Sequence, residues 1–205
     1  MMITAGPMRR RVELTVMKER KMNYILTGQM LLIMCCAVYL IWWYRGFRPN
    51  TNVSRVGGVN GLLLLVTAAL GIAGLILSLM PVPALTEPPV PAAIIVAAGA
   101  VGYFVLLLVT KVIFHRVVTS ELFLITGWTV LEMTVLVRLR AGEIIGPAGV
   151  LVMCAVIAAA FVISMILYVA YYKMEEMKAF YAAMVPLVTE AAAMAMMVAA
   201  MVSGR

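Results

Sequence analysis

Six long apolar stretches constrain this chain more than any other feature of its sequence. Their limits are residues 24–44, 59–80, 91–113, 121–137, 146–172 and 180–202. A helix needs about 20 apolar residues to cross the hydrocarbon core of a bilayer. The fourth stretch is the weakest candidate, because it has only 17 residues and contains two carboxylates. We predict an all-α, polytopic integral membrane protein built as a bundle of six transmembrane helices.

The composition excludes a water-soluble fold. Of the 205 residues, 65% are apolar and 12% are charged, and the mean hydropathy is +1.07, whereas soluble domains are about half apolar and a quarter charged. A domain of this length buries only about 70% of its surface, so the excess apolar surface must face lipid. The apolar residues occur in blocks and do not alternate with polar ones, which argues against an outer-membrane barrel.

The connections between the stretches are short and rich in turn-forming residues. Five prolines in the segment 81–91 rule out a helix there, because proline lacks the N–H that a helix interior needs. No connection is long enough to hold a soluble domain. We therefore expect one six-helix domain over residues 22–205. Before it lies a basic tail over residues 1–21. If Met17 or Met22 is the true start, the residues before that methionine are not part of the native protein.

Lys and Arg in short loops stay preferentially in the cytoplasm. Here they favour opposite orientations, depending on whether the N-terminal tail is counted. The side with the first, third and fifth loops has seven bases, and the other side has three, or nine with the tail. The odd-numbered helices end in aromatic residues next to bases, as in the run Trp42-Trp43-Tyr44-Arg45, an arrangement typical of a cytoplasmic interface. We predict a multi-pass protein of the inner membrane with both termini outside.

The six stretches also divide into three hairpins of similar length. Each even-numbered stretch holds a polar group well inside: Thr67 in the second, Thr129 with Glu132 in the fourth, and Thr189 with Glu190 in the sixth. This pattern is compatible with an internal repeat whose polar positions meet at the repeat interface, as in many transporters. The alternative is that any six-helix protein can be divided in this way.

Two carboxylates, Glu132 and Glu190, fall near the middle of their stretches. An ionised acid inside hydrocarbon costs at least ~2.5–3.5 kcal/mol and usually faces a cavity or a partner. Glu121 and Trp128 share the helix face of Glu132, and Pro186 loosens the turn before Glu190. The predicted transport path or proton site comprises Glu132, Glu190, Thr129, Thr189, Pro186, Glu121 and Trp128. The alternative is that the two central acids only bond neighbouring helices or a partner subunit.

Other chemistry finds little support in the sequence. The single histidine, His115, excludes a bis-histidine haem or a multi-histidine metal centre within one chain; it is either solvated at the interface or a pH sensor. Cys35, Cys36 and Cys154 lie inside helices, as small hydrophobes do. No cofactor or metal is indicated. The chain has no aspartate and no phosphate-binding or nucleophile motif, so only an intramembrane glutamate remains as a catalytic acid or base.

The net charge of +7 does not indicate nucleic acid, because the bases lie in the tails and at helix ends, where anionic headgroups lie. We therefore expect the lipid bilayer, a small solute or ion, and other copies of this chain as partners. The leading hypothesis is an oligomeric channel or transporter, proton-coupled through Glu132 and Glu190. The second is a non-catalytic subunit or assembly factor of a larger membrane complex. The third is a membrane sensor or lipid-handling enzyme using the aromatic and basic helix ends.

Overall fold

A computed structural model describes residues 7–49, 57–79, 92–113 and 120–203, and nearly all of these residues are helical. No strand occurs in these ranges. The elements are α1 (Pro7–Phe47), α2 (Val59–Leu79), α3 (Ala92–Val112), α4 (Ser120–Ala141), α5 (Pro147–Ala170), the 3-10 helix η1 (Tyr171–Lys173), α6 (Glu176–Ala182) and α7 (Val185–Ser203).

Six segments of these helices are long and apolar enough to cross a membrane, which confirms the predicted six-helix bundle. Two helix ends differ from the apolar limits. α4 continues past residue 137 to Ala141, with Arg138 and Arg140 in its last turn, where positive charge interacts favourably with the helix dipole. α1 begins at Pro7, so the described part of the basic tail continues the first membrane helix without a break.

The sixth crossing consists of two helices, although the apolar run 180–202 predicted one. α6 ends at Ala182 and α7 begins at Val185, with a turn between them in which the Met184 N–H donates to the Tyr181 carbonyl at 3.0 Å. Pro186 is the cause, because it has no N–H to donate to the carbonyl of Ala182 four residues earlier. The break therefore follows from the proline that the sequence placed before Glu190.

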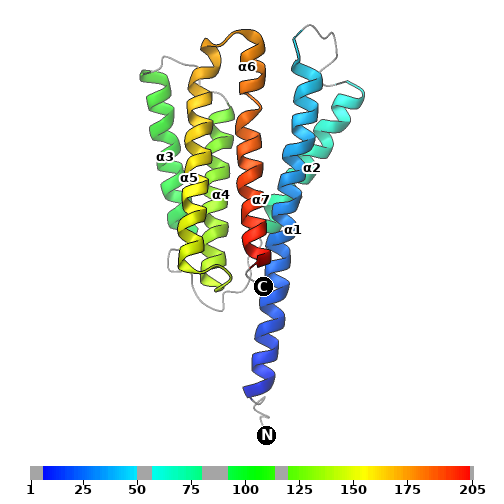
Figure 1. Cartoon of the computed structure of the whole chain (residues 1–205), viewed down its shortest axis with the longest axis vertical. Helices are drawn as coiled ribbons and strands as arrows, with labels where there is room; N and C mark the ends of the chain where they lie inside the picture. Colours follow the sequence, from blue (N-terminus) through cyan, green and yellow to red (C-terminus); the bar gives the residue numbers. More distant parts are fainter. Residues whose placement is uncertain (1–6, 50–56, 80–91, 114–119, 204–205) are drawn as a thin grey trace.

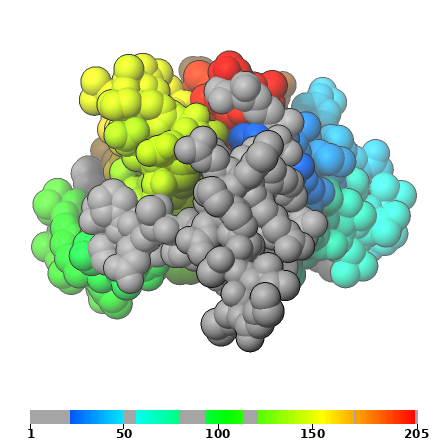
Figure 2. All heavy atoms as spheres, turned by 90° about the horizontal axis from the view of Figure 1, so that it is seen from below, coloured from blue at the N-terminus to red at the C-terminus, as the bar shows by residue number. Residues whose placement is uncertain are grey.

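The helices pack as three hairpins, α1 with α2, α3 with α4, and α5 with the sixth crossing. α7 packs against both α1 and α5 and so joins the first hairpin to the rest (Figure 1). α2 and α3 lie at opposite edges of the molecule (Figure 2). α1 begins and α7 finishes at one end of the bundle, called here the terminal end, while α6 lies at the other, called the α6 end (Figure 1).

The first hairpin is held by a close approach of its two backbones. A Cβ atom added to Gly28 would lie 2.6 Å from the Ser78 nitrogen and 2.9 Å from the Gly74 oxygen, closer than real Cβ atoms come to backbone. The sequence contains two small-residue pairs, Gly71 with Gly74 and Gly99 with Gly102, which predict close helix packing. Gly74 confirms it on α2, and Gly99 confirms it on α3, where an added Cβ atom would overlap the Val130 side chain of α4. Gly102 has nothing within 4 Å of such a Cβ atom, so it does not contribute to this packing.

The two halves of the bundle differ in packing. The terminal half is filled by a continuous apolar core from α1, α4, α5, α7 and the turn between α4 and α5. Its buried members are Ile25, Leu131, Val135, Leu136, Leu139, Ile145, Met153, Ile157, Met197 and Met201. None of these residues reaches the segments 35–43, 121–125 or 167–171 at the α6 end. The terminal half therefore holds α1, α4, α5 and α7 together, while at the α6 end a smaller core of Leu122, Ile125 and Tyr168 lies beside a cavity.

Candidate functional site

A cavity of about 340 Å³ lies between the helices at the α6 end of the bundle. Every helix except α3 contributes to its wall, and most lining side chains are apolar or aromatic. The lining residues are Cys35, Cys36, Tyr39, Trp43, Thr67, Glu121, Leu124, Ile125, Leu167, Tyr168, Tyr171, Ala182, Ala183, Pro186, Leu187 and Glu190. A volume of this size lies in the range of small-molecule sites.

The cavity extends from the membrane interface to about the middle of the bilayer. Trp43 and Tyr171 border it near the ends of α1 and α5, where interfacial aromatic residues belong. Cys36, at its deep end, is 11 residues before the end of α1 at Phe47, or ~16 Å along a helix. That is about half of a ~30 Å hydrocarbon core, so the cavity, called here the vestibule, occupies the half of the bundle at the α6 end.

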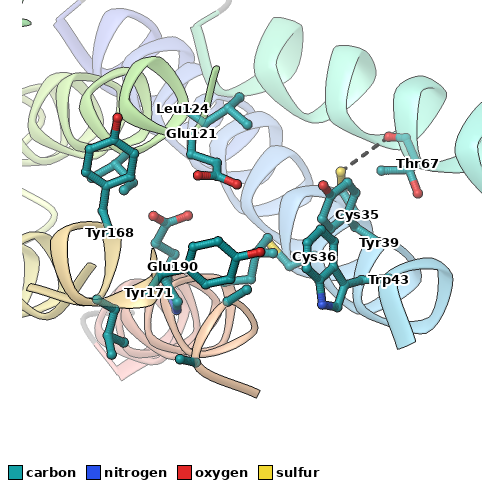
Figure 3. A pocket seen from close by; sticks show the side chains of 16 residues that line it. Cys35, Cys36, Tyr39, Trp43, Thr67, Glu121, Leu124, Tyr168, Tyr171 and Glu190 are labelled. Atoms are coloured by element: carbon teal, nitrogen blue, oxygen red, sulfur yellow. Dashed lines mark hydrogen bonds between the residues drawn. The ribbon is translucent and has the colours of Figure 1, made fainter. Parts of the chain in front are cut away.

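Glu190 is the most distinctive polar group of this vestibule. Its residue is only 9% exposed, yet its carboxylate points into the cavity, toward the carboxylate of Glu121 (Figure 3). No side chain in the described part of the protein hydrogen-bonds or ion-pairs with it. A carboxylate that bonded only a neighbouring helix would be buried as well, as Glu132 is, but it would point at its partner and not into a cavity.

Glu121 differs from Glu190 in its setting. It lies in the first turn of α4, and it is exposed. A carboxylate in the first turn of a helix is stabilised by the helix dipole. The structure therefore places one acid at the mouth of the vestibule and one at its depth, facing each other.

Glu132 does not line the cavity, although the sequence grouped it with Glu190. It is 1% exposed, and its Oε1 accepts a hydrogen bond of 3.0 Å from Nε2 of Gln29, which is itself fully buried. The second oxygen, Oε2, has no partner among the described residues. Glu132 is still near enough to Glu190 for the two charges to interact. It therefore joins α1 to α4 beyond the deep end of the vestibule.

The remaining predicted site residues have local roles. Thr129 donates to the Ile125 carbonyl at 2.9 Å and Thr189 donates to the Pro186 carbonyl at 2.8 Å, so both hydroxyls bond within their own helices. Trp128 packs against the apolar core of the terminal half and is absent from the cavity wall. His115 lies outside the described residues.

Several lining residues were not predicted as part of a site. Cys35, Tyr39 and Trp43 recur every four residues and form one face of α1 toward the cavity (Figure 3). The Cys35 thiol donates to the Thr67 carbonyl at 3.3 Å, which ties this face to α2. The spacing was visible in the sequence, but the apolar character of the surrounding residues gave no reason to separate this face from the lipid-facing ones.

The charged side chains that line the cavity, among the described residues, are both acidic. The described part of the wall contains two carboxylates and no lysine, arginine or histidine. Among the described residues, no group of three or more His, Cys, Asp or Glu side chains is placed to hold a metal ion. The site therefore offers negative charge in a mostly apolar and aromatic setting.

No protein-family model, curated protein or solved structure matches this chain. Its architecture is that of a multi-pass membrane protein with six apolar helices.

Proposed function

We propose that this protein is a small transporter for an ion or small solute, with the vestibule as its binding chamber and Glu190 as its central group. The observation that carries the proposal is the buried carboxylate of Glu190, which points into the cavity and lacks a partner among the described residues. A carboxylate inside hydrocarbon is costly. A group retained at that cost without a packing contact is best explained by a ligand or proton that it receives.

Proton coupling follows if Glu190 binds either a proton or the solute. Loading the solute then releases a proton to the vestibule, and reprotonation releases the solute on the other side. Other titratable groups face or interact with Glu190 from neighbouring elements: Cys35, Cys36 and Tyr39 on α1, Glu121 and Glu132 on α4, Tyr168 on α5 and Tyr171 in η1. Glu121 at the mouth offers a relay between Glu190 and water.

The proposed orientation in the inner membrane has both termini outside. The α6 end, with its aromatic and basic helix ends, then faces the cytoplasm and the vestibule opens inward. An Arg205→Cys variant without the three native cysteines tests this in intact cells. Labelling by an impermeant maleimide is expected, and protection until the cells are permeabilised would reverse the orientation.

Flux into proteoliposomes that contain only this protein tests the transport proposal. We expect uptake of at least one class among protons, alkali cations, organic cations and small metabolites. Glu190→Gln should abolish the flux while expression and elution volume are retained. Glu175→Gln is the matched control, because Glu175 is highly exposed and, among the described residues, pairs with Lys178 at 2.9 Å. Equal flux in both variants would contradict the assignment of Glu190.

A second candidate, a subunit of a larger membrane complex, is favoured by the exposure of α2 and α3. Leu65 on α2 is 71% exposed and Phe104 on α3 is 62% exposed. α3 packs mainly on α4 and presents the rest of its surface outward. Absence of flux for every probe, together with co-purification of one defined membrane protein, would replace the transport proposal with this one.

A further inference from the structure

We propose that the vestibule binds a small organic cation with an aromatic or aliphatic body, a substrate class recognised jointly by the Glu190 and Glu121 carboxylates and the surrounding rings. This inference rests on the proposed function, because it names the solute that the same chamber would accept. Its three supports are the charge of the wall, the character of the lining and the volume of the cavity.

The charge of the wall selects the sign of the ligand. Glu190 and Glu121 point toward one another across the cavity (Figure 3), and no basic side chain of the described residues lines it. Glu132 adds a further negative charge near Glu190, and a cation in the cavity relieves the repulsion between such like charges. An anion would meet these like charges, and the described wall has no positive side chain to offset them.

The lining selects a cation with apolar surface over a strongly hydrated one. Four aromatic side chains, Tyr39, Trp43, Tyr168 and Tyr171, come from α1, α5 and η1 and border the same cavity. Aromatic faces attract ammonium groups, and such rings are the common recognition element for quaternary ammonium ligands. The aliphatic lining, with Leu124, Ile125, Leu167 and Leu187, suits the hydrocarbon part of the ligand.

The number of oxygen ligands argues against a divalent metal as the occupant. Calcium takes six to eight oxygens and magnesium six. Besides its two carboxylates, the described wall offers hydroxyls from Tyr39, Thr67, Tyr168 and Tyr171. These are not the carboxylate, carbonyl and water oxygens that calcium and magnesium sites use. A cation that brings its own hydrocarbon substituents needs far fewer ligands. The cavity of about 340 Å³ is large for a bare ion and suits a molecule of roughly ten heavy atoms.

Equilibrium binding of radiolabelled benzyltrimethylammonium to the full chain in lipid nanodiscs tests this inference. We expect saturable binding to the wild-type protein. Benzenesulfonate, an anion of similar size, should not compete. Both probes act on the wild-type chain, so this comparison does not depend on the folding of any variant. Unsaturable binding, or equal competition by the anion, would overturn the inference.

Variants then locate the site. Glu190→Gln should weaken binding at least about tenfold, because it removes the charge and keeps the shape. Trp43→Leu should weaken it by about 2- to 30-fold through loss of a cation–π partner. Glu175→Gln, exposed and outside the cavity, should leave it unchanged. If Glu190→Gln does not fold, the affinity of Trp43→Leu still tests the location of the site. Unchanged affinity in either variant, once it is shown to be folded, would overturn the assignment of the site to this cavity.

Binding and flux together separate this inference from the proposed function. Saturable, Glu190-dependent binding without flux of any probe would support the cation site and reject transport. Flux of another solute, with no benzyltrimethylammonium binding, would reject the cation site and leave transport standing. Absence of both would reject both.

Discussion

The buried pair of Gln29 and Glu132 gives the sharpest test of how this bundle is held together. The amide of Gln29 on α1 donates to Glu132 on α4 at 3.0 Å, and both side chains are almost completely buried. The remaining oxygen of each, Oε1 of Gln29 and Oε2 of Glu132, has no partner among the described residues. Each residue therefore depends on the other for the contact that satisfies it.

Replacement of one partner should cost more than the bond itself. In Gln29→Leu, Oε1 of Glu132 loses its donor, so neither carboxylate oxygen keeps a partner among the described residues. In Glu132→Leu, the amide of Gln29 loses its acceptor. An unsatisfied buried polar group costs about 1–3 kcal/mol, so we expect each single variant to lower the free energy of unfolding by about that amount. In the double variant both polar groups are replaced by apolar groups of similar volume, which can be nearly neutral.

The expected signature is thus non-additivity, measured by circular dichroism during titration of mixed micelles with sodium dodecyl sulfate. The free energy of unfolding of the double variant should lie within about 1 kcal/mol of the wild-type value. Its loss of stability should therefore be well below the sum of the two single losses. Gln29→Leu combined with the exposed Glu175→Gln is the additive control. A double variant as unstable as that sum would show that the two residues do not act as a pair, and the reasoning would fail.

Three further predictions follow from other contacts. Gly28→Ala should destabilise the protein by about 1–3 kcal/mol, because its Cβ would overlap the Ser78 backbone, whereas Gly102→Ala, with open space around it, should be neutral or up to about 1 kcal/mol stabilising; the same titration measures both. Pro186→Ala should join α6 and α7 into one helix and reduce liposome flux without loss of stability, and unchanged flux would show that the break has no role. With the other cysteines replaced, Cys35 in the cavity wall should react more slowly with a maleimide when benzyltrimethylammonium is present; an unchanged rate would place the cation elsewhere.

Most of the fold was predictable because length and hydropathy decide where a helix crosses a bilayer. The observed helix ends differ from the predicted ones where a charged residue ended the apolar run but did not end the helix. α4 continues through Arg138 and Arg140, and α1 extends back to Pro7. No glycine or proline interrupts α1 between Pro7 and Gly28, so nothing stops the helix at residue 24. Apolar windows therefore predict which residues cross the membrane, whereas glycine and proline predict where a helix ends.

The site was less predictable, because it depends on which helices meet. Glu132 and Glu190 are alike in sequence, as single acids deep in apolar segments. Only the packing of α1 against its neighbours gives Glu132 a donor in Gln29 and leaves Glu190 in a cavity. Pro186 predicted a loosened turn before Glu190, since the loss of an N–H is a local effect, but the single helix predicted there is two helices in the structure. The pairing of α1 with α4 is not local, and no spacing within either segment encodes it.

The asymmetry between the two halves of the bundle favours a carrier over an open pore. A pore needs a continuous water path, but beyond Glu190 the terminal half is filled by the apolar core, where Leu139 and Met197 are fully buried. Access to the terminal end would require α1 and α2, locked together at Gly28, to move relative to α4 and α5. α7 contacts both groups and carries Glu190 just after its proline break. Movement about α7 would therefore change which side of the membrane Glu190 faces.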